Sequence, residues 1–206
     1  MRVVKEAEVR KSEILDIAEQ LFNTKGYADT SISDILERSG IARGTLYYHF
    51  ASKEDILNAV VERNLGSLAE EMQKIADSDL SVFDKYYKII GIQMNQGSVT
   101  EVLHNIENAQ FHQKSFSLGL AKFAPVYCQV IEEGIKRGVF HTGYPRETAE
   151  LLLCASRITD PGIFTWTKEQ LSEKNEAYIC LLERALGTEK GYFLPFLPLL
   201  NKQEQR

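Results

Sequence analysis

The sequence predicts an all-α protein with an N-terminal unit of three short helices and a larger helical C-terminal body. Three observations predict this fold class. Apolar residues recur at the helical period along most of the 206 residues. The 13 glycines and 5 prolines fall mainly between these periodic segments. The hydrophobic fraction of 44% is sufficient for a substantial core in one or two domains.

The N-terminal segment predicts three helices whose apolar faces can close a small core. The first covers about 7–25 and the third about 42–50. The second is capped by Ser31 or Ser33. A tight turn at Ser39-Gly40 separates it from the third helix. The residues expected to face inward are Ile14, Ala18, Leu21, Phe22, Ile32, Ile35, Leu36, Ile41, Leu46 and Phe50.

A long fourth helix is expected to begin at Ser52. Ser52 and Asp55 resemble a capping box, with Asp in place of the usual Glu or Gln. No flexible linker separates this helix from the first three. The tail after Lys190 is expected to be irregular, and Pro161-Gly162 interrupts the C-terminal body. Further helices are expected at about 80–95, 99–112, 115–137, 146–160 and 168–186.

The charge balance excludes a uniformly basic protein that coats nucleic acid. The formal net charge is -5. The first 55 residues hold 8 Lys and Arg against 10 Asp and Glu, which is a net charge of -2. Any attraction to DNA must therefore come from the local placement of a few positive groups on one face.

The cysteines and the apolar segments favour a cytoplasmic protein without a membrane anchor. The three cysteines, Cys128, Cys154 and Cys180, form no CxxC pair, so neither a zinc site nor a disulfide framework is predicted. We expect them to be small buried hydrophobic residues in a reducing compartment. The N-terminus lacks the apolar segment of a signal peptide. The longest apolar stretch, 192–200, is too short to cross a bilayer.

Residues 31–55 have the pattern of a helix-turn-helix. Two short helices joined by a glycine-containing turn place the second helix in the DNA major groove. Arg43 can donate two hydrogen bonds to guanine or bind phosphate, and Gly44 lets the backbone approach DNA closely. The candidate DNA contacts are Thr30, Ser31, Arg43, Gly44, Thr45, Tyr47, Tyr48, His49 and Lys53. The alternative is an ordinary three-helix subdomain with a solvated polar face.

The run from Ile41 to Leu57, IARGTLYYHFASKEDIL, resembles the signature of the TetR family of bacterial transcription regulators. The resemblance covers about the first 60 residues and its motif is highly specific. The later helices match the family only in number and length. Upstream residues that also fit the pattern are Ala18, Phe22, Gly26, Thr30, Ser31, Ile35 and Gly40.

The resemblance implies an all-helical homodimer. Residues 1–51 would form the helix-turn-helix DNA-binding domain, and residues 52–206 a helical domain for ligand binding and dimerisation. The expected function is that of a repressor released from a palindromic operator by a small-molecule effector, with an activator role left open. The resemblance places Arg43, Gly44, Thr45 and Tyr47 at the major groove, and Tyr48, His49, Lys53 and Thr30 at the phosphate backbone.

The C-terminal body mixes aromatic and polar residues, a composition typical of a small-molecule site. Each aromatic residue can equally belong to the ordinary core. His104 and His112 lie about 80° apart around one helix, which is poor for joint metal binding, and we expect no metal or cofactor. The candidate ligand contacts are Tyr86, Tyr87, His104, Asn108, Phe111, Phe123, Tyr127 and Trp166.

The helices near 146–160 and 168–186 are the candidate dimer interface, because two such pairs form a four-helix bundle. Alternatively, their apolar faces close the core of the monomer. Pro161-Gly162 leaves the length of the first of these helices open. The residues of the two seams are Leu151, Leu152, Ala155 and Ile158, and Tyr178, Leu181, Leu182, Ala185 and Leu186.

The sequence gives no support to an enzyme. It contains no Gly-rich phosphate loop, no HExxH, no G-x-S-x-G and no nucleophile and base at a telling spacing. The remaining alternative is a DNA-binding regulator that a protein partner controls, or one that acts without any effector.

Overall fold

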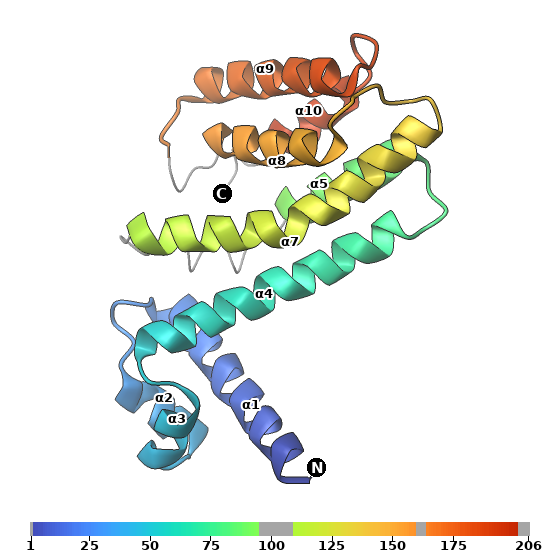
Figure 1. Ribbon diagram of the computed structural model, residues 1–206. Coiled ribbons are helices and arrows are strands. Elements are labelled where there is room, and N and C mark those ends of the chain that lie inside the picture. Colours follow the sequence, from blue (N-terminus) through green and yellow to red (C-terminus); the bar gives the residue numbers. More distant parts are fainter. Residues whose placement is uncertain (1, 95–108, 160–163, 202–206) are drawn as a thin grey trace. The chain divides into compact units, whose positions relative to one another are not determined.

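The computed structural model describes residues 2–94, 109–159 and 164–201, and every regular element within these ranges is helical. Figure 1 shows the order of the helices along the chain. The elements are α1 (Arg2–Lys25), α2 (Ile32–Ser39), α3 (Arg43–His49), α4 (Lys53–Ala76), α5 (Val82–Met94), α7 (Ala109–Lys136), α8 (Pro145–Ser156), η1 (Arg157–Thr159), α9 (Lys168–Leu186), η2 (Leu194–Phe196) and α10 (Leu197–Leu200). The prediction of an all-α fold is confirmed.

The described chain divides into two compact units. The first contains Met1–Leu65 and the start of α7 up to Ser115. The second contains α4 from Gly66 onward, α5, and the chain from Phe116. Helix α4 therefore contributes its first half to one unit and its second half to the other. The division of function expected between residues 51 and 52 stays a prediction.

The inner faces of α1, α2, α3 and the first half of α4 form the core of the N-terminal unit. Between α2 and α3, Gly40 has a left-handed φ of 63° and donates its N–H to the Leu36 carbonyl at 3.0 Å. Residues with a Cβ rarely adopt this conformation, so Gly40 permits the tight turn predicted at this position. The buried apolar side chains of the unit include Ile14, Ala18, Phe22, Ile35, Leu46, Phe50, Ile56 and Leu57.

Polar contacts also join α1 to the first half of α4. Arg63 lies 2.6 Å from Asp16 and 2.7 Å from Glu19, measured between guanidinium nitrogens and carboxylate oxygens. The amide of Asn64 donates to the other oxygen of Glu19 at 2.6 Å. These contacts keep the side of α4 that carries Arg63 and Asn64 facing α1. They therefore set the rotation of α4 about its own axis within this unit.

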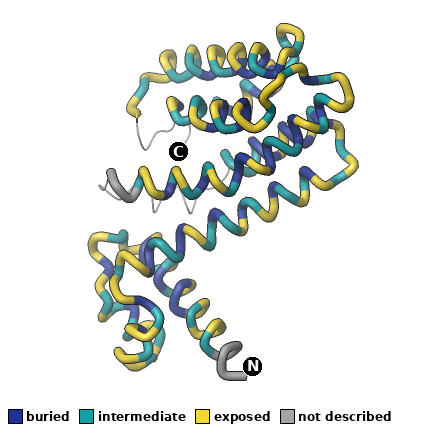
Figure 2. The backbone as a smooth tube through the Cα atoms, in the orientation of Figure 1, coloured by how far each residue is buried: buried dark blue, intermediate teal, exposed yellow. Residues whose placement is uncertain are grey.

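The C-terminal unit packs α5, α7, α8, α9 and the C-terminal segment around an aromatic core. Tyr86, Phe140, Phe193 and Phe196 are each at most 1% exposed. Their rings meet edge-to-face or tilted, with centroids 5.1–6.4 Å apart. These are the separations that aromatic pairs favour. Figure 2 shows buried and exposed positions alternating along the helices, as expected for amphipathic helices around a core.

A nearly buried ion pair connects α5 to α7 in this unit. The Lys85 ammonium lies 2.6 Å from one oxygen of Glu133, and the Arg137 guanidinium lies 2.6 Å from the other. Lys85 is only 3% exposed, so removing Glu133 would leave the buried ammonium without an opposite charge. Gln73 of α4 donates to Gln129 of α7 at 2.8 Å, which ties the second half of α4 to the same helix.

The C-terminal segment differs from the sequence prediction. The expected irregular tail is wrong, because residues 194–200 form η2 and α10. The side chain of Glu183 accepts the N–H groups of Gly191 and Phe193 at 2.9 and 3.1 Å. This contact fixes the start of the segment, and its large apolar side chains then complete the core. Local propensity missed the order because the stabilising partners lie on α5 and α9.

Two further expectations are corrected. Helix α7 runs without a break from Ala109 to Lys136, although a break was expected near residues 113–114. Neither of these two positions is a glycine or proline that would interrupt a helix. Cys154 and Cys180 are exposed and Cys128 is half-buried, so the prediction of three buried cysteines is wrong. The exposed pair occupies the outer faces of α8 and α9.

Other expectations fall on parts of the chain that the structure leaves out. Most of the helix expected at 99–112 lies outside the described residues, and so does Pro161-Gly162. Helix α8 ends at Ser156 and is followed by η1. Among the described helices, none combines the length and apolar character that crossing a bilayer requires.

Candidate nucleic-acid interface

Helix α3 has one face toward the core and one toward solvent. Leu46 and Phe50, one turn apart, are 0% and 5% exposed. On the opposite side Tyr48 is 80% exposed, and the neighbouring Tyr47 is 46% exposed. Two large aromatic side chains in water leave apolar surface that a partner can cover. The solvent face of α3 therefore has the character of a binding surface.

The polar groups of this face have no partners within the described protein. The side chains of Arg43, Thr45, Tyr47 and Tyr48 make no hydrogen bond or ion pair with any described residue. Apart from its two chain neighbours and the backbone of its own helix, no described atom lies within 4 Å of the point where a Cβ on Gly44 would stand. The face thus offers a guanidinium, three hydroxyls and a gap for close backbone approach, which suit phosphates and base edges.

Ring contacts hold Tyr48 to the rest of the unit. Its ring meets His49 edge-to-face at a centroid distance of 5.0 Å, and His49 is tilted against Phe50 at 6.3 Å. Because Phe50 is buried, this series of rings connects the exposed tyrosine to the core. His49 is half-buried beneath Tyr48, so it is less accessible than the sequence prediction implied.

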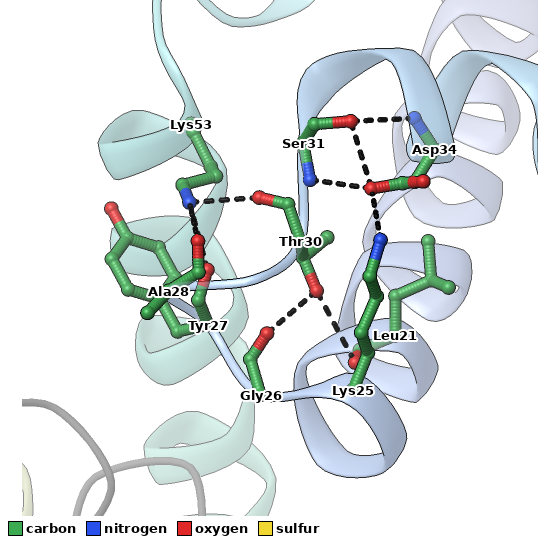
Figure 3. Close-up of polar contacts among 9 residues, drawn as sticks. All are labelled: Leu21, Lys25, Gly26, Tyr27, Ala28, Thr30, Ser31, Asp34 and Lys53. Atoms are coloured by element: carbon green, nitrogen blue, oxygen red, sulfur yellow. Dashed lines mark hydrogen bonds and ion pairs between the residues drawn. The ribbon is translucent and has the colours of Figure 1, made fainter.

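Ser31 caps α2 through a reciprocal contact with Asp34 (Figure 3). The Asp34 N–H donates to the Ser31 hydroxyl at 3.1 Å, and the Ser31 N–H donates to the Asp34 carboxylate at 2.7 Å. The Ser31 hydroxyl also donates to that carboxylate at 2.8 Å. Both donors of Ser31 are therefore used by the cap, and the structure does not support its predicted contact with phosphate.

Asp34 also accepts a charged hydrogen bond from Lys25 at 2.8 Å. Lys25 first, and then the two donors of Ser31, hold the pKa of the Asp34 carboxyl well below its ordinary value. A carboxyl whose pKa is lower in the folded protein stabilises the fold above its unfolded pKa. This contribution is lost as the pH falls through the folded value.

Thr30 faces inward, contrary to its predicted role at the phosphate backbone. Its side chain is 1% exposed. Its hydroxyl donates to the Gly26 carbonyl at 2.7 Å and lies 3.4 Å from the Leu21 carbonyl (Figure 3). The single proton of the hydroxyl is thereby used to satisfy the carbonyls at the end of α1. Thr30 anchors the loop that leads from α1 into α2.

Lys53 has partners within the protein, and its predicted contact with the phosphate backbone stays a prediction. Its ammonium donates to the carbonyls of Tyr27, Thr30 and Ala28 at 2.7, 2.8 and 3.3 Å (Figure 3). It also lies 4.3 Å from the centroid of the Tyr27 ring. An ammonium has three N–H groups, and in this arrangement all three have a carbonyl partner within the protein. Desolvation lowers the pKa of Lys53, with Asp29 and Asp34 opposing this effect.

We name the loop Gly26–Thr30 together with Lys53 the α1–α4 clip. Thr30 holds the loop to the end of α1, and Lys53 holds it to the start of α4. The sequence did not predict that Tyr27 binds the Lys53 ammonium, because Tyr27 lies 26 residues before Lys53. No local spacing could have revealed it, because the groups that Lys53 binds are backbone carbonyls common to every residue.

The predicted ligand contacts do not all lie together in the structure. Tyr86 and Tyr127 line a pocket of the C-terminal unit, whereas Tyr87 and Phe123 are not among its lining residues. Trp166 lies elsewhere: it stacks on Phe164 at 5.5 Å and donates to the Ile158 carbonyl at 2.7 Å. His104, Asn108 and the side chain of Phe111 lie outside the described residues. The ligand role of the whole set stays a prediction.

The predicted dimer seams are partly core. Leu152, Leu182 and Leu186 are buried within the protomer, at 3%, 0% and 0% exposed. Leu151 on α8 is 69% exposed and Leu181 on α9 is 45% exposed. The exposed apolar positions of this region, which we name the α8–α9 outer face, are Leu151, Cys154, Ile158, Ala177, Cys180 and Leu181.

Two family models match the chain. The model for bacterial regulatory proteins of the tetR family matches residues 14–60, which include α2, α3 and the start of α4. The model for the tetracyclin repressor-like C-terminal domain matches residues 88–180. Both matches follow the order of the two units described above.

Individual proteins agree with these models. The chain is 30% identical over 149 residues to the transcriptional repressor KstR2 of Rhodococcus jostii, covering 68% of this chain and 72% of that protein. It is 25% identical over 170 residues to the fatty acid metabolism regulator protein of Bacillus subtilis, covering 79% and 86%. The crystal structure of a TetR-family regulator from Pectobacterium atrosepticum shares the fold, with a TM-score of 0.73, 20% identity and coverage of 90% and 98%.

Removing the ammonium of Lys53 is expected to destabilise the N-terminal unit. Lys53→Met keeps the length of the stem but deprives three carbonyls of their donor, which should lower the free energy of unfolding by about 1–3 kcal/mol. Lys53→Arg should not restore it, because a planar guanidinium cannot reach three converging carbonyls in the same way. Chemical denaturation measures both variants.

Arg10→Met is the matched control, since Arg10 makes an exposed ion pair with Glu13 and should change stability by no more than about 1 kcal/mol. A different result would show that Lys53 contacts a phosphate directly. In that case Lys53→Met would be as stable as the wild type, and the slope of log affinity for DNA against log salt concentration would become shallower by about one.

Proposed function

The chain belongs to the TetR family of bacterial transcriptional regulators, and we propose that it is a dimeric, cytoplasmic repressor that a small-molecule effector releases from a palindromic operator. The solvent face of α3 carries this proposal. Its donors have no partners within the described protein, and the most exposed of them, Tyr48, lies opposite the buried Leu46 and Phe50 on a helix that the N-terminal unit holds in place. The name of the KstR2 relative supports repression as the sign of control.

Each group on α3 has a defined part in reading DNA. Arg43 donates two parallel hydrogen bonds to O6 and N7 of a guanine in the major groove. Tyr47 and Tyr48 donate from their hydroxyls to phosphate oxygens or bases, and Thr45 contacts a base or its methyl group. Gly44 allows the backbone to approach the groove wall. The chain is acidic overall, so affinity depends on these few local contacts and falls as salt rises.

Dimerisation through the α8–α9 outer face gives the two-fold symmetry that a palindrome requires. Two copies of α8 and α9 would bury Leu151 and Leu181 in a four-helix bundle. Exposed apolar side chains at these positions support an interface, because a monomer gains nothing from leaving them in water. The two α3 helices would then contact half-sites about 34–36 Å apart, or a multiple of this distance.

The proposed effector acts through α4. This helix is part of both units, from Lys53 in the α1–α4 clip to Gln73 beside α7. A ligand that shifts the second half of α4 would change the separation of the two α3 helices, and ligand and DNA would favour different states. Such coupling is typically about 1–3 kcal/mol and reciprocal.

One observation favours a second candidate, a regulator without a small-molecule effector. The enclosed part of the pocket in the C-terminal unit holds little more than a water molecule. So small an enclosed volume at this pocket is what a constitutive or protein-controlled regulator would show. Direct measurement of ligand binding separates the two, because only the effector-controlled regulator binds a small molecule that lowers its operator affinity.

Arg43→Ala is expected to weaken binding to the specific operator by about 1–3 kcal/mol, because one bidentate base contact is lost. Binding to unrelated duplexes should change far less. Fluorescence anisotropy with labelled duplexes at fixed salt measures both affinities. Arg10→Ala, on the exposed side of α1, is the control. Equal loss for specific and unrelated DNA would assign Arg43 to phosphate instead.

Gly44→Ala is expected to have opposite effects on the stability of the fold and on DNA affinity. No atom crowds the new methyl group, and Ala favours a helix over Gly by up to about 1 kcal/mol, so the variant should be as stable as the wild type or more so. Its DNA affinity should nevertheless fall, because the methyl group keeps α3 away from the groove.

Gly66→Ala on α4 is the matched control for this test. Its added Cβ meets only the end of Lys122 at 3.9 Å, so it should gain similar stability and bind DNA normally. Thermal unfolding and anisotropy measured on both variants test the assignment. Wild-type DNA affinity in Gly44→Ala would exclude close approach at this position.

Charge placed on the α8–α9 outer face should break the dimer. The double variant Leu151→Arg, Leu181→Arg introduces like charges that a two-fold interface would bring together and desolvate. Sedimentation equilibrium at micromolar concentration should show a dimer for the wild type and a monomer for this variant. Val9→Arg, at another exposed apolar position, should remain dimeric. A monomeric wild type would rule out the proposed interface.

A further inference from the structure

The C-terminal unit contains a pocket between α5, α7, α8, α9 and the end of α10. Its total empty volume is about 400 Å³ including the part open to solvent, while its enclosed part is about the size of a water molecule. The described residues that line it are Tyr86, Ile90, Gln93, Met94, Tyr127, Ala149, Leu152, Leu153, Ser156, Thr159, Tyr178 and Leu200. Most of them are apolar, and the polar ones are concentrated in a few hydroxyls and one amide.

Three of these hydroxyls belong to tyrosines, and only two of the three are satisfied. The Tyr127 hydroxyl donates to the side-chain carbonyl of Gln93 at 2.7 Å. The Tyr178 hydroxyl donates to the Leu152 carbonyl at 3.3 Å. The Tyr86 hydroxyl makes no hydrogen bond with a described residue, although Tyr86 is 1% exposed. The Tyr86 hydroxyl is not one of the fully enclosed polar atoms of the described residues that lack a partner, so it keeps a small accessible area. In the wall of a mainly apolar pocket it is a ready hydrogen-bond donor.

The position of Tyr86 is fixed by its surroundings. Its ring meets Tyr127 edge-to-face at a centroid distance of 5.3 Å and is tilted against Phe193 at 5.6 Å. Both neighbouring rings are themselves buried, so they hold the Tyr86 ring in its place in the pocket wall. Desolvation by burial raises the pKa of Tyr86 and of Tyr127 well above the usual value, so both phenols stay protonated at neutral pH.

None of the described lining side chains carries a charge. A carboxylate or ammonium brought between them would lose its hydration without gaining an opposite charge, which is costly in an apolar site. The nearly buried cation of this unit, Lys85, is already paired with Glu133. The pocket therefore disfavours charged groups and offers a neutral O–H donor in an apolar wall.

We propose that this pocket binds a neutral, mainly apolar molecule through an oxygen acceptor, such as a carbonyl or hydroxyl oxygen, that receives a hydrogen bond from Tyr86. This rests on the proposed effector function and names the chemical class of its ligand. Entry requires the pocket to widen. Met94 and Leu200 lie on its wall, and the flexible side chain of methionine adapts readily to a new neighbour.

Three probes of equal chain length test the ligand class: 2-decanone, decanoate and decylamine, the last two being charged at pH 7. Isothermal titration calorimetry on the full chain without DNA measures each affinity. The ketone should bind at least about 10-fold more tightly than either charged probe. Tyr86→Phe should weaken ketone binding about 10-fold by removing the donor.

The control variant is Tyr87→Phe, the adjacent tyrosine, which is 37% exposed and outside the pocket lining. It should bind the ketone like the wild type, and thermal unfolding checks that both variants are folded. The proposal is overturned if decanoate binds as tightly as the ketone, if Tyr86→Phe binds like the wild type, or if the ketone shows no saturable binding up to about 1 mM.

The assay contains no DNA, so its outcome is independent of the proposed repressor function. If the ketone does not bind as proposed, the proposal that α3 binds the operator is unaffected, and it can still be tested with the Arg43 variant. Failure of operator binding, in turn, leaves the measured ketone affinity intact. The two proposals can therefore fail separately.

Discussion

The orientation of α3 depends on the α1–α4 clip, in which one ammonium satisfies three carbonyls of a five-residue loop. A loop of this length has many conformations, and α2 and α3 move with its end. The buried Thr30 hydroxyl donates to the Gly26 carbonyl and holds the loop at the end of α1. The Lys53 ammonium donates to the Tyr27 carbonyl and holds the loop at the start of α4. With both ends of the loop fixed, the capped start of α2 and the left-handed turn at Gly40 determine the direction in which α3 leaves α2. A base-reading helix needs this stiffness, because a small rotation would move its donors out of reach of the groove.

The sequence predicted the helices of the N-terminal unit and the solvent face of α3, because both follow from local periodicity. Leu46 and Phe50, four residues apart, determine which side of α3 is buried and leave Tyr48 on the other side. It could not predict the roles of Thr30 and Lys53. Both look like free phosphate donors in sequence, since their partners are backbone carbonyls brought near only by the folded loop. Ser31 was recognised as a possible cap, but its commitment to Asp34 and Lys25 became clear only from the geometry.

The C-terminal body was less predictable, for a related reason. Aromatic composition left open whether these rings line a ligand site or form the ordinary core, and it does not say which rings converge. Tyr86 and Tyr127 meet in the pocket, whereas Trp166 packs on Phe164 beneath Lys174. The C-terminal segment reads as loop because of its two prolines, yet Phe193 and Phe196 are among the most buried residues of the chain. Burial against distant elements outweighed local propensity in each case.

A dimer that reads DNA through its two α3 helices selects a sequence with two-fold symmetry. Selection of bound duplexes from a random pool by the full-length protein, followed by sequencing, measures this selectivity most directly. We expect an enriched inverted repeat whose half-sites are separated by about one helical turn of DNA or a multiple of it. A pool with no enriched sequence, or only an unrepeated one, would show that α3 does not read DNA from a symmetric dimer.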